Sequence, residues 1–220
     1  MEAYQIELHS IKVDENGTLK EGAEGKNIIS VTMFYPRPGV PALTSIRTVE
    51  LKDGEVLKFS GKFLNEKLLF KETIVGDTPL IIELSAVEEV EKIDKFMVKL
   101  LKSVAVAAIG AVTGIGAVLT AVATVAVNSI FDVVENDTKD TIHKIGQNEL
   151  VINNDTEDGI KSVNLIVPKT IELTSKGKNN KGETVIKKFS LNKGKANAEV
   201  KLRIKKIKLQ ESKTTKNLMT

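Results

Sequence analysis

The feature of the sequence that most constrains its fold is an uncharged stretch at residues 103–131. Its 29 residues exceed the roughly 20 that an apolar helix needs to cross a bilayer. Charged residues return immediately afterwards, beginning with Asp132. The folded chain must therefore shield this stretch from water, either in lipid or against protein.

The residues that lead into this stretch have a helical period. Apolar residues recur at intervals of three or four, with charged residues between them, at Val87, Val90, Ile93, Met97 and Leu100. A glycine-containing break at residues 113–116 would divide the uncharged stretch into two legs. The pattern predicts an apolar α-helical hairpin over residues 87–147.

Short runs rich in β-branched residues lie on both sides of the predicted hairpin and are separated by turn signals such as Asp53-Gly54. Strands before and after an insertion favour an antiparallel sandwich over a parallel α/β sheet. The predicted strands are residues 4–13, 27–35, 45–51, 56–60, 67–72, 80–85, 149–152, 162–167, 170–173, 184–189 and 198–209.

These patterns predict an α+β chain that is mainly β. A discontinuous sandwich of roughly eight to ten strands is expected over residues 1–86 and 148–210. The hairpin would interrupt it, and residues 211–220 would form a flexible tail.

Part of the sandwich resembles a C2 domain. An Arg47-Thr48 pair leads to Asn65-Glu66 and Phe70, and then to a run at residues 80–84 that reads LIIEL. Residues 194–204 resemble the closing strand of the same family. The resemblance implies calcium-dependent lipid binding through paired aspartates directly after the run at 80–85. Residues 86–90 read AVEEV, so we expect no calcium site and no cofactor.

Small residues recur in the middle of the uncharged stretch. Gly110, Gly114 and Gly116 have the spacing that lets helices approach closely in lipid. This array resembles the glycine zippers and apolar hairpins of pore-forming proteins. The resemblance implies that the contacts with lipid or with other copies are made by Gly110, Gly114, Gly116, Ile109, Ile115 and Leu119. The alternative is a hairpin buried in a soluble assembly.

Charge is divided unevenly along the chain. Residues 161–220 contain 16 Lys or Arg against 4 Asp or Glu, although the whole chain has a net charge of only +3. Such a basic segment attracts anionic partners. The predicted anionic-surface residues are Lys201, Arg203, Lys205, Lys206 and Lys208, and the alternative is a solvated strand face.

Several classes of protein are disfavoured. The chain has no Cys, which removes disulfides and thiolate chemistry, and an aromatic content of 4% offers few stacking platforms for nucleic-acid bases. No catalytic motif is present, so we expect no enzyme. The first residues lack the features of a secretory signal peptide, which predicts synthesis in the cytoplasm, followed by export or membrane association.

The leading hypothesis is a membrane-active protein, a toxin or exported effector, that docks through its sandwich and inserts or oligomerises through the hairpin. Its partners would be a lipid membrane or copies of itself. A second hypothesis is a structural component of a phage-like or secretion particle, with the hairpin buried between subunits. A third is a peripheral lipid-binding module that does not insert.

Overall fold

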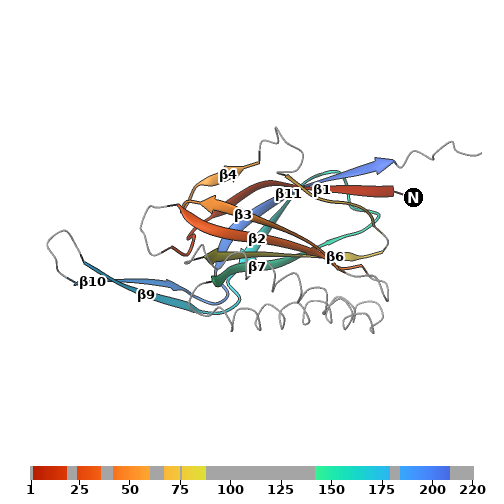
Figure 1. Ribbon diagram of the computed structural model, residues 1–220. Helices are drawn as coiled ribbons and strands as arrows, with labels where there is room; N and C mark the ends of the chain where they lie inside the picture. Colours follow the sequence, from red (N-terminus) through yellow and green to blue (C-terminus); the bar gives the residue numbers. More distant parts are fainter. Residues whose placement is uncertain are drawn as a thin grey trace, which may run out of the picture.

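The protein is mainly β. The computed structural model describes residues 2–18, 24–35, 42–59, 67–74, 76–87, 142–178 and 184–208, and every element assigned within them is a strand (Figure 1). Nine strands form one antiparallel sheet in the order β3-β2-β6-β7-β8-β11-β1-β4, with β5 also paired to β1. They are β1 (Glu2–Val13), β2 (Gly25–Met33), β3 (Leu43–Leu51), β4 (Val56–Lys58), β5 (Leu68–Thr73), β6 (Thr78–Val87), β7 (Ile142–Ile152), β8 (Gly159–Ile166) and β11 (Ala196–Lys208).

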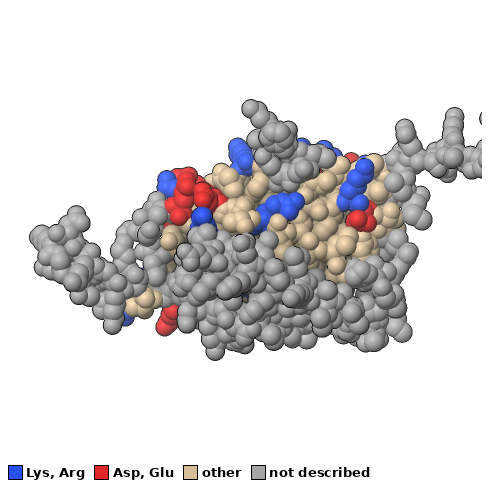
Figure 2. All heavy atoms as spheres, viewed as in Figure 1, with Lys and Arg blue, Asp and Glu red and all other residues tan. Residues whose placement is uncertain are grey.

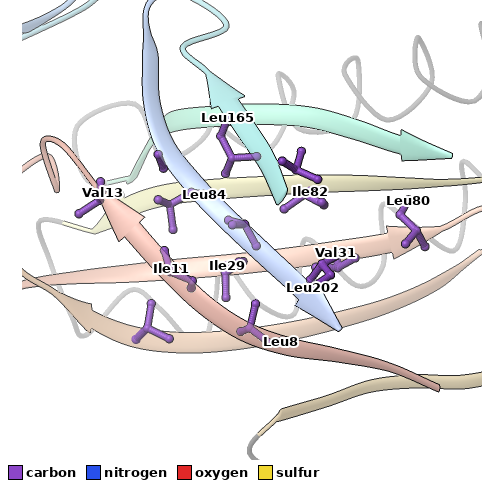
Figure 3. Packing of buried hydrophobic residues seen from close by; sticks show 14 of the residues in the cluster. Leu8, Ile11, Val13, Ile29, Val31, Leu80, Ile82, Leu84, Leu165 and Leu202 are labelled. Carbon is purple, nitrogen blue, oxygen red and sulfur yellow. The ribbon is translucent and has the colours of Figure 1, made fainter. Parts of the chain in front are cut away.

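The sheet folds over on itself and encloses the core. Figure 3 shows β1 and β11 crossing over β2 and β6, with the labelled apolar side chains between them. The alternation of each strand places one set of residues inside, including Leu8, Leu84 and Leu202, which are at most 1% exposed. This burial of aliphatic side chains between the two layers is the main source of stability.

The sheet folds over at the junction between β7 and β8. Only one register pair, Gln147 with Ile166, joins these two strands. Gly146 lies beside this junction, and a Cβ atom built on it would be 2.8 Å from the Cβ of Leu165. Glycine is therefore required here because the backbone of β7 lies against the Leu165 side chain of β8.

The opposite margin of the sheet comes close to closing a barrel. A guanidinium NH2 of Arg47 on β3 donates a hydrogen bond to the carbonyl oxygen of Leu68 on β5, at 2.8 Å. Tyr35, just after β2, also lies near Glu72 on β5, and burial together with the negative charge of Glu72 raises the Tyr35 pKa. Side chains thus bridge the margin between the edge strands β3 and β5.

A two-stranded ribbon stands apart from the main sheet. β9 (Ile171–Lys178) and β10 (Thr184–Leu191) pair only with each other. Its base is anchored, because Ile171 and Leu191 belong to the core cluster and Phe189 packs against it. Figure 1 shows the rest of the ribbon extending away from the sheet.

The strand predictions are confirmed, since each of the eleven runs corresponds to a strand. The segment that interrupts the strands is shorter than the predicted 87–147. Val87 ends β6, and β7 begins at Ile142 instead of at 149, so residues 142–147 are strand and not helix. Tertiary pairing with β6 holds this polar, Gly-containing segment in an extended conformation.

The resemblance to a C2 domain interrupted by a glycine-zipper hairpin is wrong. Nine of the eleven strands that the structure describes form one continuous folded sheet, where a C2-like sandwich would divide them between two facing sheets. No helical hairpin is seen among those residues. The expected hairpin contacts at Gly110, Gly114, Gly116, Ile109, Ile115 and Leu119 fall in residues 88–141, outside the described part.

Candidate anionic-surface site

Strand β11 places three of the predicted basic residues on one face. Val200, Leu202 and Ile204 are fully buried, so the alternating residues Lys201, Arg203 and Lys205 lie on the outer face of the sheet. The side chains of Lys201 and Lys205 are 39% and 45% exposed. One row of cations therefore follows the outside of the strand.

Neighbouring strands extend this row into a basic face. Register pairing places Lys12 on β1, Lys58 on β4 and Lys71 on β5 on the same side of the sheet. All three are exposed. The basic face, as used below, consists of Lys12, Lys58, Lys71, Lys201, Arg203 and Lys205.

Two apolar residues share this side of the sheet. Ile160 on β8 pairs with Arg203, and Val56 on β4 pairs with Lys12. Their exposures of 48% and 50% make them two of the exposed large hydrophobic residues in the described part of the chain. Apolar side chains beside cations are suited to the boundary between lipid headgroups and acyl chains.

Two carboxylates within the basic face differ in burial, and a third, Asp14, lies 3.9 Å from Lys12 at its edge. Glu199 is at the margin, where Ser162 donates a hydrogen bond to it and Lys201 lies 3.4 Å away. The Ser162 hydrogen bond, assisted by Lys201, holds the pKa of Glu199 below its usual value. Glu7 on β1 is only 2% exposed.

Acidic side chains gather elsewhere. Figure 2 shows them near the left end of the face in view, over the turn between β3 and β4. Glu50, Asp53 and Glu55 are exposed there, and Glu55 pairs with Lys52. This separation leaves the basic face with an excess of positive charge.

Of the other two predicted basic residues, Lys206 lies outside this outer row. Lys206 is exposed at the strand end, where its ammonium group lies 5.8 Å from the centre of the Tyr4 ring and donates a hydrogen bond to the Asn154 carbonyl at 2.8 Å. Lys208 pairs with Glu2 at the end of β11. Lys206 therefore stabilises the fold and is not placed for surface binding in this row.

A second notable face was not predicted. Ile28, Ile81, Val87 and Ile142 on β2, β6 and β7 are buried but do not belong to the core cluster. Their register puts them on the outer side of that layer. All ten residues of β6 are buried, so this strand is covered on both faces.

An ion pair lies in the middle of this second face. The Nζ of Lys144 is 2.8 Å from Oε1 of Glu83, and their side chains are 5% and 2% exposed. Lys144 also donates a hydrogen bond to Gln147. The sequence does not reveal this ion pair. Glu83 is a single acidic residue within an apolar run of β6, and nothing local to that run indicates that its partner is Lys144 on β7.

Comparison with known proteins supplies no family for this fold and site. No family model matches the chain, and no curated protein is significantly similar to it. The residues that the structure describes contain no group of three or more potential metal ligands among His, Cys, Asp and Glu. Within the same residues, no helix has the length and apolar character to span a membrane.

Proposed function

We propose that this chain is a non-enzymatic, membrane-active protein that docks on anionic lipid through its basic face. The observation that carries the proposal is the row of Lys201, Arg203 and Lys205, reinforced by three lysines on adjacent strands. Each cation close to an anionic membrane contributes about 1 kcal/mol of attraction. Six of them on one face are sufficient for peripheral binding.

The uncharged residues 103–131 are the proposed lipid-contacting part of the same protein. Val87 and Ile142 are register partners on β6 and β7, so the segment leaves and re-enters the sheet at neighbouring positions. A segment tethered at such closely spaced points can act without rearrangement of the strand order. This combination of docking and lipid contact is suited to a toxin or exported effector that is made in the cytoplasm.

The test of lipid contact is leakage of a dye from vesicles that contain phosphatidylglycerol. Val118→Asp places one carboxylate in the uncharged stretch, at a cost of about 3 kcal/mol for a position near the bilayer centre. We expect the wild type to release the dye and the variant to bind vesicles without release. Equal release by both proteins would refute lipid contact through this stretch.

The second candidate is an assembly component, and the β9–β10 ribbon favours it. An isolated pair of strands is marginally stable in water, and Glu172, Thr174 and Lys188 are exposed on it. Such ribbons gain stability when a neighbouring subunit packs on them. A large, stable oligomer in gel filtration without detergent, together with no vesicle binding, would favour this candidate.

A further inference from the structure

The basic face contains a buried acid at its centre. Glu7 lies on the outer side of β1, directly opposite Arg203 of β11. Its side chain is 3% exposed, whereas the lysines around it reach solvent. A carboxylate on an outer sheet face is ordinarily exposed, so its burial beneath cations requires an explanation.

Two lysines from distant parts of the chain converge on Glu7, one on β11 and one immediately before β5. The Nζ of Lys205 lies 3.7 Å from Oε1, and the Nζ of Lys67 lies 3.9 Å from Oε2. Both distances are longer than a hydrogen bond, although Gln5 does hydrogen-bond the carboxylate. The lysines are thus attracted to Glu7 without being fixed to it, and the side chain of Lys205 remains 45% exposed.

We propose that Glu7 is a built-in counter-ion that restrains the binding of anionic phospholipid to the basic face. This inference rests on the proposed docking function. In the free protein, Glu7 neutralises part of the charge of Lys67 and Lys205. On a membrane, headgroup phosphates compete for the same ammonium groups, and binding is weakened by the attraction that each lysine loses.

The restraint is local because it depends on burial. A charge held beneath the surface is screened less by salt than an exposed one. Glu199, the other acid of the face, has a side chain that is 36% exposed and pairs with Lys201 at 3.4 Å. Glu7 and Glu199 carry the same charge, so replacing each of them in turn changes the net charge equally. A difference in binding between the two variants then reports the position of the carboxylate.

The experiment measures the binding of the whole chain to mixed phosphatidylglycerol and phosphatidylcholine vesicles by co-sedimentation. Glu7→Gln keeps the size of the side chain and its acceptor for Gln5. We expect about five-fold tighter binding for this variant, because Lys67 and Lys205 no longer share their charge with a buried counter-ion, a gain equivalent to about one added cation. Glu199→Gln, the matched control, is expected to bind less than two-fold tighter, and thermal unfolding checks that both variants fold.

A second pair of proteins keeps the inference testable. In a Lys67→Gln/Lys205→Gln background, Glu7→Gln should no longer increase binding, because its two partners are gone. A persistent increase in that background, or equal gains from Glu7→Gln and Glu199→Gln, would overturn the counter-ion role while leaving docking intact. If Glu7→Gln binds vesicles and the wild type does not, the counter-ion role is supported. If the wild type, Glu7→Gln and Glu199→Gln all fail to bind, both the counter-ion role and the docking function are overturned.

Discussion

The ammonium group of Lys144 lies 2.8 Å from the carboxylate of Glu83, and both side chains are almost completely buried. The two residues come from neighbouring strands, β7 and β6, which flank the insertion of residues 88–141. Removal of one partner from a buried ion pair leaves the other charge uncompensated. The pair therefore makes this face sensitive to single substitutions.

Lys144→Ala is expected to destabilise the protein by about 3–5 kcal/mol, because it removes the cation that lies 2.8 Å from the buried Glu83 carboxylate. The double variant Glu83→Leu/Lys144→Met should recover most of this loss. Urea unfolding measures both. Lys52→Ala, which breaks the exposed pair with Glu55, is the control and should leave the free energy of unfolding nearly unchanged. A similarly small loss for Lys144→Ala would contradict the buried pairing.

Gly146→Ala is expected to destabilise the fold by about 1–3 kcal/mol through overpacking. The added Cβ would lie 2.8 Å from the Leu165 Cβ, at the junction where the sheet folds over. The midpoint of thermal unfolding is the measurement. An unchanged midpoint would mean that β7 and β8 are not held this closely together.

Asn197→Ala is expected to lower the free energy of unfolding by about 1–3 kcal/mol, because it leaves buried polar groups without their hydrogen-bond partner. The Asn197 side chain is fully buried, accepts a hydrogen bond from the Glu15 amide and donates to the carbonyls of Glu15 and Ile145. It thus joins the turn after β1 to β7. Asn164→Ala, at an exposed position on β8, should leave the unfolding free energy nearly unchanged.

Tyr35 is expected to make stability fall at alkaline pH. Burial, and then the charge and hydrogen bond of Glu72, raise the pKa of Tyr35 well above its ordinary value of 10.0. Since the raised pKa belongs to the folded state, the unfolded chain loses this proton first as the pH rises. The contribution of Tyr35 to stability is therefore complete at pH values below the ordinary tyrosine pKa and is lost as the pH rises above it. Tyr35→Phe should therefore lose less stability than the wild type over that alkaline range.

The sequence was a good guide to strands because alternation and turn chemistry are local. β1, for example, alternates inward Tyr4, Ile6 and Leu8 with outward polar residues, and it ends at a turn containing Gly17. The start of β7 was missed because its first residues, including Lys144 and Gly146, have no strand-like pattern. Their conformation depends on pairing with β6, which is distant in the sequence.

The candidate site was only partly predictable. Alternation in β11 suffices to group Lys201, Arg203 and Lys205, and the structure places them together on one face. Lys58 and Lys71 come from strands whose register no local pattern specifies. Glu7 meets Lys67, just before β5, and Lys205 of β11 only in the folded protein, so the three-dimensional arrangement alone identifies this group.

The most direct test of the docking function replaces Lys201, Arg203 and Lys205 together with Gln and measures vesicle co-sedimentation. At about 1 kcal/mol for each cation, binding to phosphatidylglycerol-containing vesicles should weaken by about 100-fold. Wild-type binding should also decline as salt is added.

The matched control replaces three exposed lysines at other positions, Lys169, Lys193 and Lys195, so that the net charge changes equally. The account predicts that this control binds nearly as well as the wild type, while the β11 variant binds about 100-fold more weakly. Equal binding by the two triple variants, or wild-type binding that is insensitive to salt, would contradict the claim that the basic face docks on anionic lipid.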